Sequence, residues 1–153
     1  MINAENIKIF KNEKAIKKLN LAKRYFENAK NLLKKAGIDE NKILYIDIKY
    51  VSSASGAAYL SALEALKAIF IPKGKIDKEF IKRKIRYISI YQKILNELHI
   101  GKDKDILLNL LKSVYDILYL GGYYRELQNK KAIDAGFEAV EKIIKIVENY
   151  IKF

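Results

Sequence analysis

Apolar side chains recur three and four positions apart along most of the chain, which is the spacing of one face of an α-helix. The first such run predicts a helix from Glu13 to Ala36. Its expected inward positions are Ile16, Leu19, Ala22, Phe26, Ala29 and Leu33. Asn12 can cap the start of this helix, and Gly37 follows its end, where glycine often closes a helix. Residues 1–11 are expected to form a short lead-in.

The second run predicts a helix from Asn41 to Phe70, with Asp39 or Asn41 as its cap and Pro72 beyond its end. This segment is apolar on most sides, which is typical of a central helix that several neighbours contact. Small side chains form one stripe that lets a neighbour approach closely: Ala54, Ala58, Ser61, Ala62 and Ala65. Its clearly polar edge consists of Lys49, Glu64 and Lys67.

Three more helices are predicted, from Lys78 to Leu98, from Asp103 to Leu120 and from Asn129 to Tyr150. Asp77 is the expected cap of the first of them. Its inward positions are Phe80, Tyr87, Tyr91, Ile94, Leu95 and Leu98. The inward positions of the last helix are Ile133, Phe137, Val140, Ile144, Val147 and Ile151. Gly121-Gly122 interrupts the pattern, so the fourth helix either ends there or continues through a kink.

The fold class that follows is all-α. One proline and seven glycines are few helix breakers for 153 residues. Short connections force successive helices to run antiparallel. We therefore expect a single antiparallel up-and-down bundle of about five helices, forming one domain over residues 1–153.

Residue types missing from the chain exclude several kinds of chemistry. Without cysteine there is no disulfide, zinc–thiolate site or thiol nucleophile. The single histidine, His99, cannot make a two-histidine metal site. The sequence also has no phosphate-binding glycine loop, HExxH motif or Ser–His–Asp set. We expect no metal site and no cofactor.

No segment is predicted to cross a membrane. The longest run without charge, Tyr50 to Leu63, is too short and too rich in serine to span a bilayer. The first residues lack the apolar core of a signal peptide. We expect a cytoplasmic protein.

The net charge of +12 concerns partners rather than fold. It allows binding to nucleic acid, anionic lipid or an acidic protein, and a bias toward lysine in the composition explains it equally well. Half of this charge lies in residues 72–93, which hold eight basic and two acidic side chains. Four of the cations fall on one narrow helix face: Lys78, Lys82, Arg86 and Lys93. That face either follows phosphates or is a solvated surface, and solvated surfaces are the commoner case.

A second cluster lies at the junction before the last helix, where Tyr123, Tyr124 and Arg125 are followed by Lys130 and Lys131. Aromatic rings beside a guanidinium can stack on bases or grip an anion. Tyrosines can equally pack in the bundle with their hydroxyls outward. Both interpretations stay open at the level of sequence.

Three stretches of the chain together resemble the HEPN superfamily of helical domains. They are AKRYFENAKNLLKKAG from Ala22 to Gly37, SGAAYLSALEALKAIF from Ser55 to Phe70, and YYRELQNKKAIDAGFEAVEKII from Tyr123 to Ile144. The resemblance implies a helical bundle, and that superfamily includes RNA-cleaving toxins that often act beside a nucleotidyltransferase partner.

The hallmark of those nucleases is an arginine followed four to six residues later by a histidine. Arg125 matches the arginine, but the histidine should stand at Lys130, Lys131 or Ala132 and is missing. The imidazole that would transfer protons near neutral pH is therefore absent. The resemblance supports the fold and argues against the nuclease, so we expect no catalytic residues.

The leading functional hypothesis is a non-enzymatic helical binding or assembly module that forms a homodimer. The alternative is an RNA-associated protein of HEPN type, either a degenerate ribonuclease or a partner in a toxin system. A small-molecule-binding bundle is the third hypothesis. The candidate anion- or nucleic-acid-binding residues are Lys78, Lys82, Arg86, Lys93, Tyr123, Tyr124, Arg125, Lys130 and Lys131.

Overall fold

The computed structural model describes residues 4–76, 80 and 87–151, with side chains described from Glu13 onward. Its elements are α1 (Ala4–Ala36), α2 (Ile48–Phe70), α4 (Ile88–Asn96), α5 (Lys102–Val114), the π-helix η1 (Tyr115–Tyr124) and α6 (Lys130–Ile151). Over the described ranges the chain forms no strand, only two isolated bridges between loops. The all-α prediction is confirmed.

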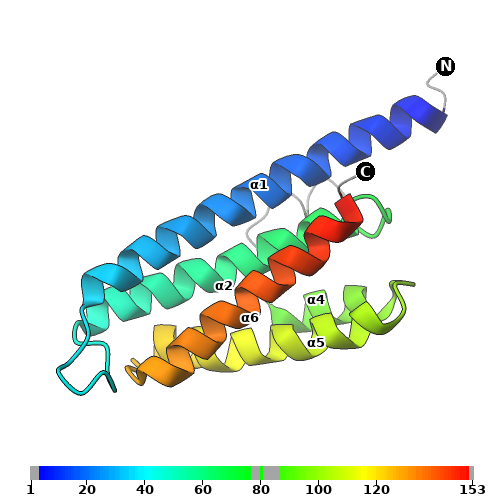
Figure 1. The fold of residues 1–153 in the computed structure, drawn as a ribbon. Coiled ribbons are helices and arrows are strands. Elements are labelled where there is room, and N and C mark those ends of the chain that lie inside the picture. The colour runs from blue at the N-terminus through cyan, green and yellow to red at the C-terminus, as the bar shows by residue number, and fades with distance from the viewer. Residues whose placement is uncertain (1–3, 77–79, 81–86, 152–153) are drawn as a thin grey trace.

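Successive helices run antiparallel, and α2 lies at the centre of the bundle (Figure 1). It contacts α1, η1, α6, α4 and α5. Every residue from Ser61 to Ile71 is buried, which fits a helix whose sequence is apolar on most sides. Across the described part of the chain, no helix combines the length and apolarity needed to cross a membrane.

The predicted lead-in at residues 1–11 is wrong, because α1 is already helical at Ala4. Residues 4–12 contain no glycine or proline, so nothing in them opposes a helix. α1, with 33 residues, is longer than α2, which has 23, and its start projects past α2 (Figure 1). One inward position also changes: Ala15 is buried, whereas Ile16 is 45% exposed.

α2 begins at Ile48, seven residues later than predicted, and neither Asp39 nor Asn41 caps it. Asp47 is the N-cap, and its carboxylate accepts a hydrogen bond from the backbone N–H of Lys49 at 3.0 Å. The Asp39 carboxylate instead accepts the N–H groups of Ile43 and Leu44 and so holds a turn. Residues 37–47 therefore form a loop.

The polar edge of α2 is largely buried. Glu64 is 6% exposed and Lys67 is 1% exposed, because α1 covers this side of the helix. The Glu64 carboxylate binds the Lys67 ammonium at 3.0 Å and the Lys18 ammonium at 2.8 Å. Burial lowers the pKa of Lys67, while the charge of Glu64 opposes that shift. These paired charges fasten α1 to α2 inside the bundle.

The third predicted helix is described only in part. Asp77, Lys78, Lys82 and Arg86 lie outside the described residues. α4 begins at Ile88, and Tyr87 precedes it with an extended backbone, at a ψ of 110°. Tyr87 is 74% exposed, so its predicted inward position is wrong, whereas Tyr91, Ile94, Leu95 and Leu98 are buried as predicted.

The fourth predicted helix continues past Gly121-Gly122 as a π-helix, which differs from both a stop and a simple kink. α5 passes into η1 at Tyr115, and η1 ends at Tyr124. α6 then starts at Lys130, where the Asn129 side chain accepts the N–H of Ala132 at 2.9 Å. Its predicted inward residues are confirmed as buried: Ile133, Phe137, Val140, Ile144, Val147 and Ile151.

Candidate binding surfaces

The π-helix η1 arranges tyrosines in a row at the surface. In a π-helix the hydrogen bonds join residues five apart, so side chains four and five positions apart lie on one side. The rings of Tyr115 and Tyr119 stack with centroids 5.4 Å apart, and those of Tyr119 and Tyr123 stack at 6.0 Å. Tyr124 meets Tyr119 edge-on at 5.1 Å. These four residues form the tyrosine face.

Small residues let η1 approach α2 closely beneath this face. A Cβ atom added to Gly122 would lie 2.1 Å from the Ser55 hydroxyl oxygen, and one added to Gly56 would lie 3.0 Å from the Tyr123 ring. The Ser52 hydroxyl donates a hydrogen bond to the Tyr123 carbonyl at 3.1 Å. Gly122 therefore allows η1 and α2 to pack closely. In the sequence it appeared only as an interruption of the helical pattern.

The tyrosine face is accessible at one end. Tyr123 is 40% exposed and Tyr124 is 62% exposed. Beside them lies a hollow of about 240 Å³. It is lined by Ser53, Gly56, Ala57, Tyr59, Leu60, Tyr119 and Tyr123. Rings next to small side chains form a surface on which another apolar surface can pack.

Charges of both signs lie around the tyrosine face. The Lys112 ammonium lies 5.6 Å from the centre of the Tyr115 ring and binds the Asp116 carboxylate at 3.0 Å. Arg125 and Glu126, both exposed, follow the row. With Lys49, which is exposed on α2 one turn before Ser53, this surface carries three cations and two carboxylates, a small share of the +12 of the whole chain.

The structure divides the predicted anion-binding residues. Tyr123, Tyr124 and Arg125 come together at the end of η1. Lys130 turns to the opposite side and binds the Asp134 carboxylate at 2.5 Å. Lys131 is exposed on α6, where it lines a separate hollow of about 430 Å³ with Lys42 and Glu138.

The rest of the predicted basic stripe cannot be traced as one surface. Lys93 is exposed on α4. Lys78, Lys82 and Arg86 fall outside the part of the chain that the structure describes. The proposed stripe therefore stays a prediction.

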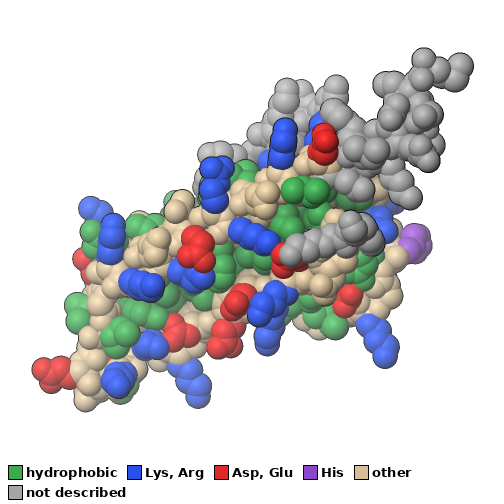
Figure 2. All heavy atoms as spheres, turned by 45° about the horizontal axis from the view of Figure 1, so that its top comes forward, with side chains coloured by type: hydrophobic (Ala, Val, Ile, Leu, Met, Phe, Trp, Pro, Cys, Tyr) green, Lys and Arg blue, Asp and Glu red, His purple; other side chains and the backbone are tan. Residues whose placement is uncertain are grey.

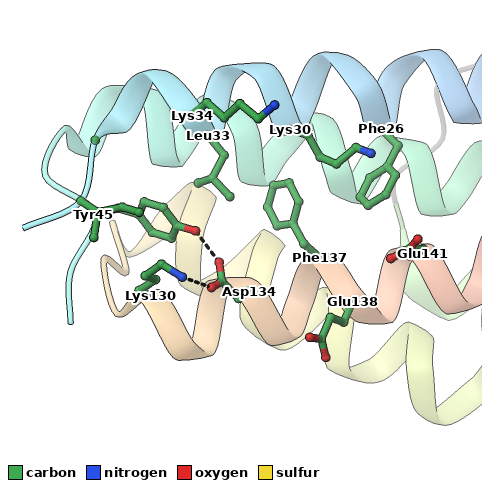
Figure 3. Close-up of a pocket in the computed structure, with 12 residues that line it drawn as sticks. Phe26, Lys30, Leu33, Lys34, Tyr45, Lys130, Asp134, Phe137, Glu138 and Glu141 are labelled. Atoms are coloured by element: carbon green, nitrogen blue, oxygen red, sulfur yellow. Dashed lines mark hydrogen bonds and ion pairs between the residues drawn. The ribbon is translucent and has the colours of Figure 1, made fainter. Parts of the chain in front are cut away.

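A groove of about 550 Å³ lies between α1 and α6, and the sequence did not indicate it. Figure 3 shows Leu33 from α1, Phe137 from α6 and Tyr45 from the loop converging on it. The Tyr45 hydroxyl donates a hydrogen bond to the Asp134 carboxylate, which also holds Lys130. Tyr45 and Asp134 are 89 positions apart, so no local motif joins them.

Tyr45 is a fixed hydrogen-bond donor at this groove. Its burial raises the pKa of its hydroxyl well above the usual range, and the hydrogen bond to Asp134 raises it further. The phenol therefore stays neutral at physiological pH and keeps its proton directed at Asp134.

Within the described residues, no three His, Asp or Glu side chains are placed to hold a metal ion. His99 is exposed at the turn between α4 and α5 and appears at one end of the molecule in Figure 2. The 13 residues of α5 alone place it about 20 Å from the start of η1, and Arg125 follows the other end of η1.

A family model described as Domain of unknown function (DUF5618) matches residues 17–149, which is most of the chain. The chain belongs to the DUF5618 family. Both the tyrosine face and the α1–α6 groove of this DUF5618 domain lie within the matched residues.

A solved structure supports the same relationship. The DUF5618 domain is similar to a protein of unknown function from Dyadobacter fermentans, with 31% sequence identity and a TM-score of 0.69. The similarity covers 89% of this chain and 98% of that protein. No curated protein matches the chain.

Proposed function

We propose that this DUF5618 domain is a non-enzymatic assembly module that forms a homodimer through the tyrosine face. The observation that carries the proposal is the stacked row of tyrosines ending in two exposed rings, Tyr123 and Tyr124. The hollow beside them receives an apolar side chain of the partner.

The composition of the tyrosine face fits a protein interface. Tyrosine and arginine are enriched at protein interfaces and dominate their binding energy. Tyr119 packs against Tyr59, with ring centroids 4.6 Å apart, and against its neighbours on η1. The row of rings is therefore ordered in the absence of a partner. Side chains that are already ordered lose little conformational entropy on binding.

The local charge supports a second copy as the partner. A two-fold axis brings the same surface of both copies together, so a strongly cationic surface would repel itself. Lys112 and Arg125 are balanced here by Asp116 and Glu126. This balance reduces the repulsion between two chains that each carry +12 where they meet on this surface.

Single-stranded RNA is the alternative partner, in keeping with the HEPN resemblance. The exposed Arg125 guanidinium next to two exposed rings favours this alternative, because bases stack on such surfaces. The carboxylates of Asp116 and Glu126 beside the rings weigh against it, since phosphate contacts supply most of the affinity for RNA. If RNA binds, its affinity should fall steeply with salt, and Arg125→Gln should flatten that dependence.

The proposal includes the absence of ribonuclease activity. Arg125 could stabilise a charged phosphate, but the Lys130 ammonium is bound to Asp134 and His99 lies beyond α5. The imidazole of the HEPN hallmark is also missing near Arg125, so the usual acceptor for the proton of a ribose hydroxyl is absent. We expect no cleavage of single-stranded RNA, with or without magnesium. Cleavage that persists through purification and disappears in Arg125→Ala would contradict this part of the proposal.

Light scattering of the purified protein at micromolar concentration tests the assembly. We expect the molar mass of a dimer for the wild type and a shift to monomer in Tyr124→Ser. Tyr87→Ser is the matched control, because Tyr87 is also an exposed tyrosine but lies at the start of α4. A monomeric wild type, or equal effects of the two substitutions, would refute assembly through the tyrosine face.

A further inference from the structure

The groove between α1 and α6 has the size and floor of a small-molecule site. Its volume of about 550 Å³ falls within the range of roughly 300–1,000 Å³ that is typical of ligand pockets. Three buried apolar side chains, Phe26, Leu33 and Phe137, line it. The rings of Phe26 and Phe137 lie 5.9 Å apart. This floor can hold the apolar body of a ligand.

One end of the groove is closed by a hydrogen-bonded wall (Figure 3). Tyr45 and Lys130 both donate to the Asp134 carboxylate, and the Lys130 ammonium lies 5.8 Å from the centre of the Tyr45 ring. These groups satisfy one another, so the wall is ordered without a ligand. It limits the length of any occupant.

The two rims carry opposite charges. Lys30 and Lys34 lie along α1, whereas Glu138 and Glu141 lie along α6. Each pair spans about one helical turn, or roughly 5 Å. With Lys130 and Asp134, the lining holds three cations and three carboxylates. The sum is zero, which suits a ligand carrying both signs. Figure 2 shows hydrophobic side chains between charged ones on the face that carries α1 and α6.

Two of the rim charges are free to accept a ligand. Among the described residues, no carboxylate lies within 4.0 Å of the Lys34 ammonium. Glu141 has only an exposed, long contact of 3.6 Å with Lys145. Figure 3 shows Glu141 on the side of α6 that faces α1, whereas Glu138 points away.

We propose that the α1–α6 groove binds a small zwitterion with an apolar body, the chemistry of an aromatic or aliphatic amino acid. The ligand's carboxylate binds Lys34, its ammonium binds Glu141, and its side chain rests on Phe26, Leu33 and Phe137. The hydrogen-bonded wall at one end limits the length of the occupant, which favours a compact ligand. This site goes beyond the proposed assembly and does not depend on it.

An NMR titration of the ¹⁵N-labelled full chain with three probes tests the proposal. The probes are L-phenylalanine, 3-phenylpropionate and 2-phenylethylamine, which share a ring but differ in charge. We expect saturable shifts of amide resonances in α1, α6 and the Tyr45 loop with phenylalanine. Each singly charged probe should bind about tenfold more weakly, because it loses one charge-assisted hydrogen bond.

Substitutions on the rims test the contributions of Lys34 and Glu141 separately. Lys34→Gln should weaken phenylalanine about tenfold and leave phenylethylamine unchanged, and Glu141→Gln should leave phenylpropionate unchanged. Lys35→Gln is the matched control, because Lys35 is exposed on α1 but does not line the groove. Equal binding of all three probes, no saturable shift, or an effect of Lys35→Gln as large as that of Lys34→Gln would overturn the proposal.

Discussion

At the scale of single residues, the contact between Ser55 and Gly122 sets how closely η1 approaches α2. The Ser55 hydroxyl is buried, and it has no hydrogen-bond partner among the described residues. A buried polar atom without a partner costs stability, so this serine is kept here by its small size. Alanine supplies the same size without the unmade hydrogen bond, and we expect Ser55→Ala to leave stability unchanged or slightly raised.

Gly122→Ala should destabilise the fold by about 1–3 kcal/mol, because the added methyl group overlaps Ser55 and the helices must move apart. Denaturant unfolding followed by circular dichroism measures this change. Ser55→Gly in the same chain opens space and should recover part of the loss. Unchanged stability in Gly122→Ala would show that η1 and α2 are not packed this closely.

Tyr150 should titrate abnormally. Its hydroxyl donates a hydrogen bond to Asp103 at 2.6 Å, and this bond, with a smaller effect of burial, raises the pKa of Tyr150 to about 12. The folded state binds this proton more tightly than the unfolded state. The hydrogen bond of Tyr150 therefore stabilises the fold fully below the unfolded-state pKa near 10, and this contribution is lost as the pH rises toward 12.

NMR of ¹³C-labelled tyrosine can follow this titration. In Asp103→Asn the negative acceptor is gone, so the pKa of Tyr150 should fall toward the ordinary value for tyrosine. Tyr150→Phe assigns the resonance. A Tyr150 resonance that titrates identically in the wild type and in Asp103→Asn would contradict the assigned hydrogen bond.

At the scale of elements, sequence spacing predicted those helix segments that bury one face. The stripe of α6 and most of that of α1 are correct, because packing against α2 imposes the 3.6-residue period. The start of α1 at Ala4 was missed because residues 4–12 do not carry a regular apolar stripe in the sequence. The exposed position of Tyr87 was missed because its backbone is extended, so Tyr87 does not continue the helical face that Tyr91 and Leu95 share.

The start of α2 shows a different reason for failure. Asp39, Asn41 and Asp47 all have side chains suited to an N-cap, and the sequence does not distinguish them. The loop between Gly37 and Asp47 is stabilised by hydrogen bonds to residues far away in the sequence. The N–H of Tyr45 binds the carbonyl of Gln128 at 2.9 Å, and that of Lys130 binds the carbonyl of Ile43 at 2.8 Å.

Cap substitutions test this assignment. Asp47→Ala should lower stability by about 1 kcal/mol, because the cap of α2 is lost, whereas Asp47→Asn should retain most of it. Asn41→Ala is the control and should have almost no effect. A larger loss in Asn41→Ala than in Asp47→Ala would place the start of α2 where the sequence pattern predicted it.

At the scale of the whole molecule, the sequence predicted part of the tyrosine face but not the α1–α6 groove. Tyr123, Tyr124 and Arg125 are adjacent in the chain, so their cluster was visible. Lys130 instead pairs with Asp134 on α6, and its contact with the ring of Tyr45, which belongs to a distant loop, had no local signal. The α1–α6 groove joins residues from three separate segments and had no local signal.

The central claim is that two copies meet through the tyrosine face, and a distance between spin labels tests it most directly. The chain has no cysteine, so Lys49→Cys introduces a single label one turn before Ser53 on α2. Double electron–electron resonance should then give an intermolecular distance shorter than α2 itself, about 35 Å for 23 residues. A label in His99→Cys, at the far end of α5, should give a longer one. No dipolar signal from Lys49→Cys, or a shorter distance from His99→Cys, would contradict the account.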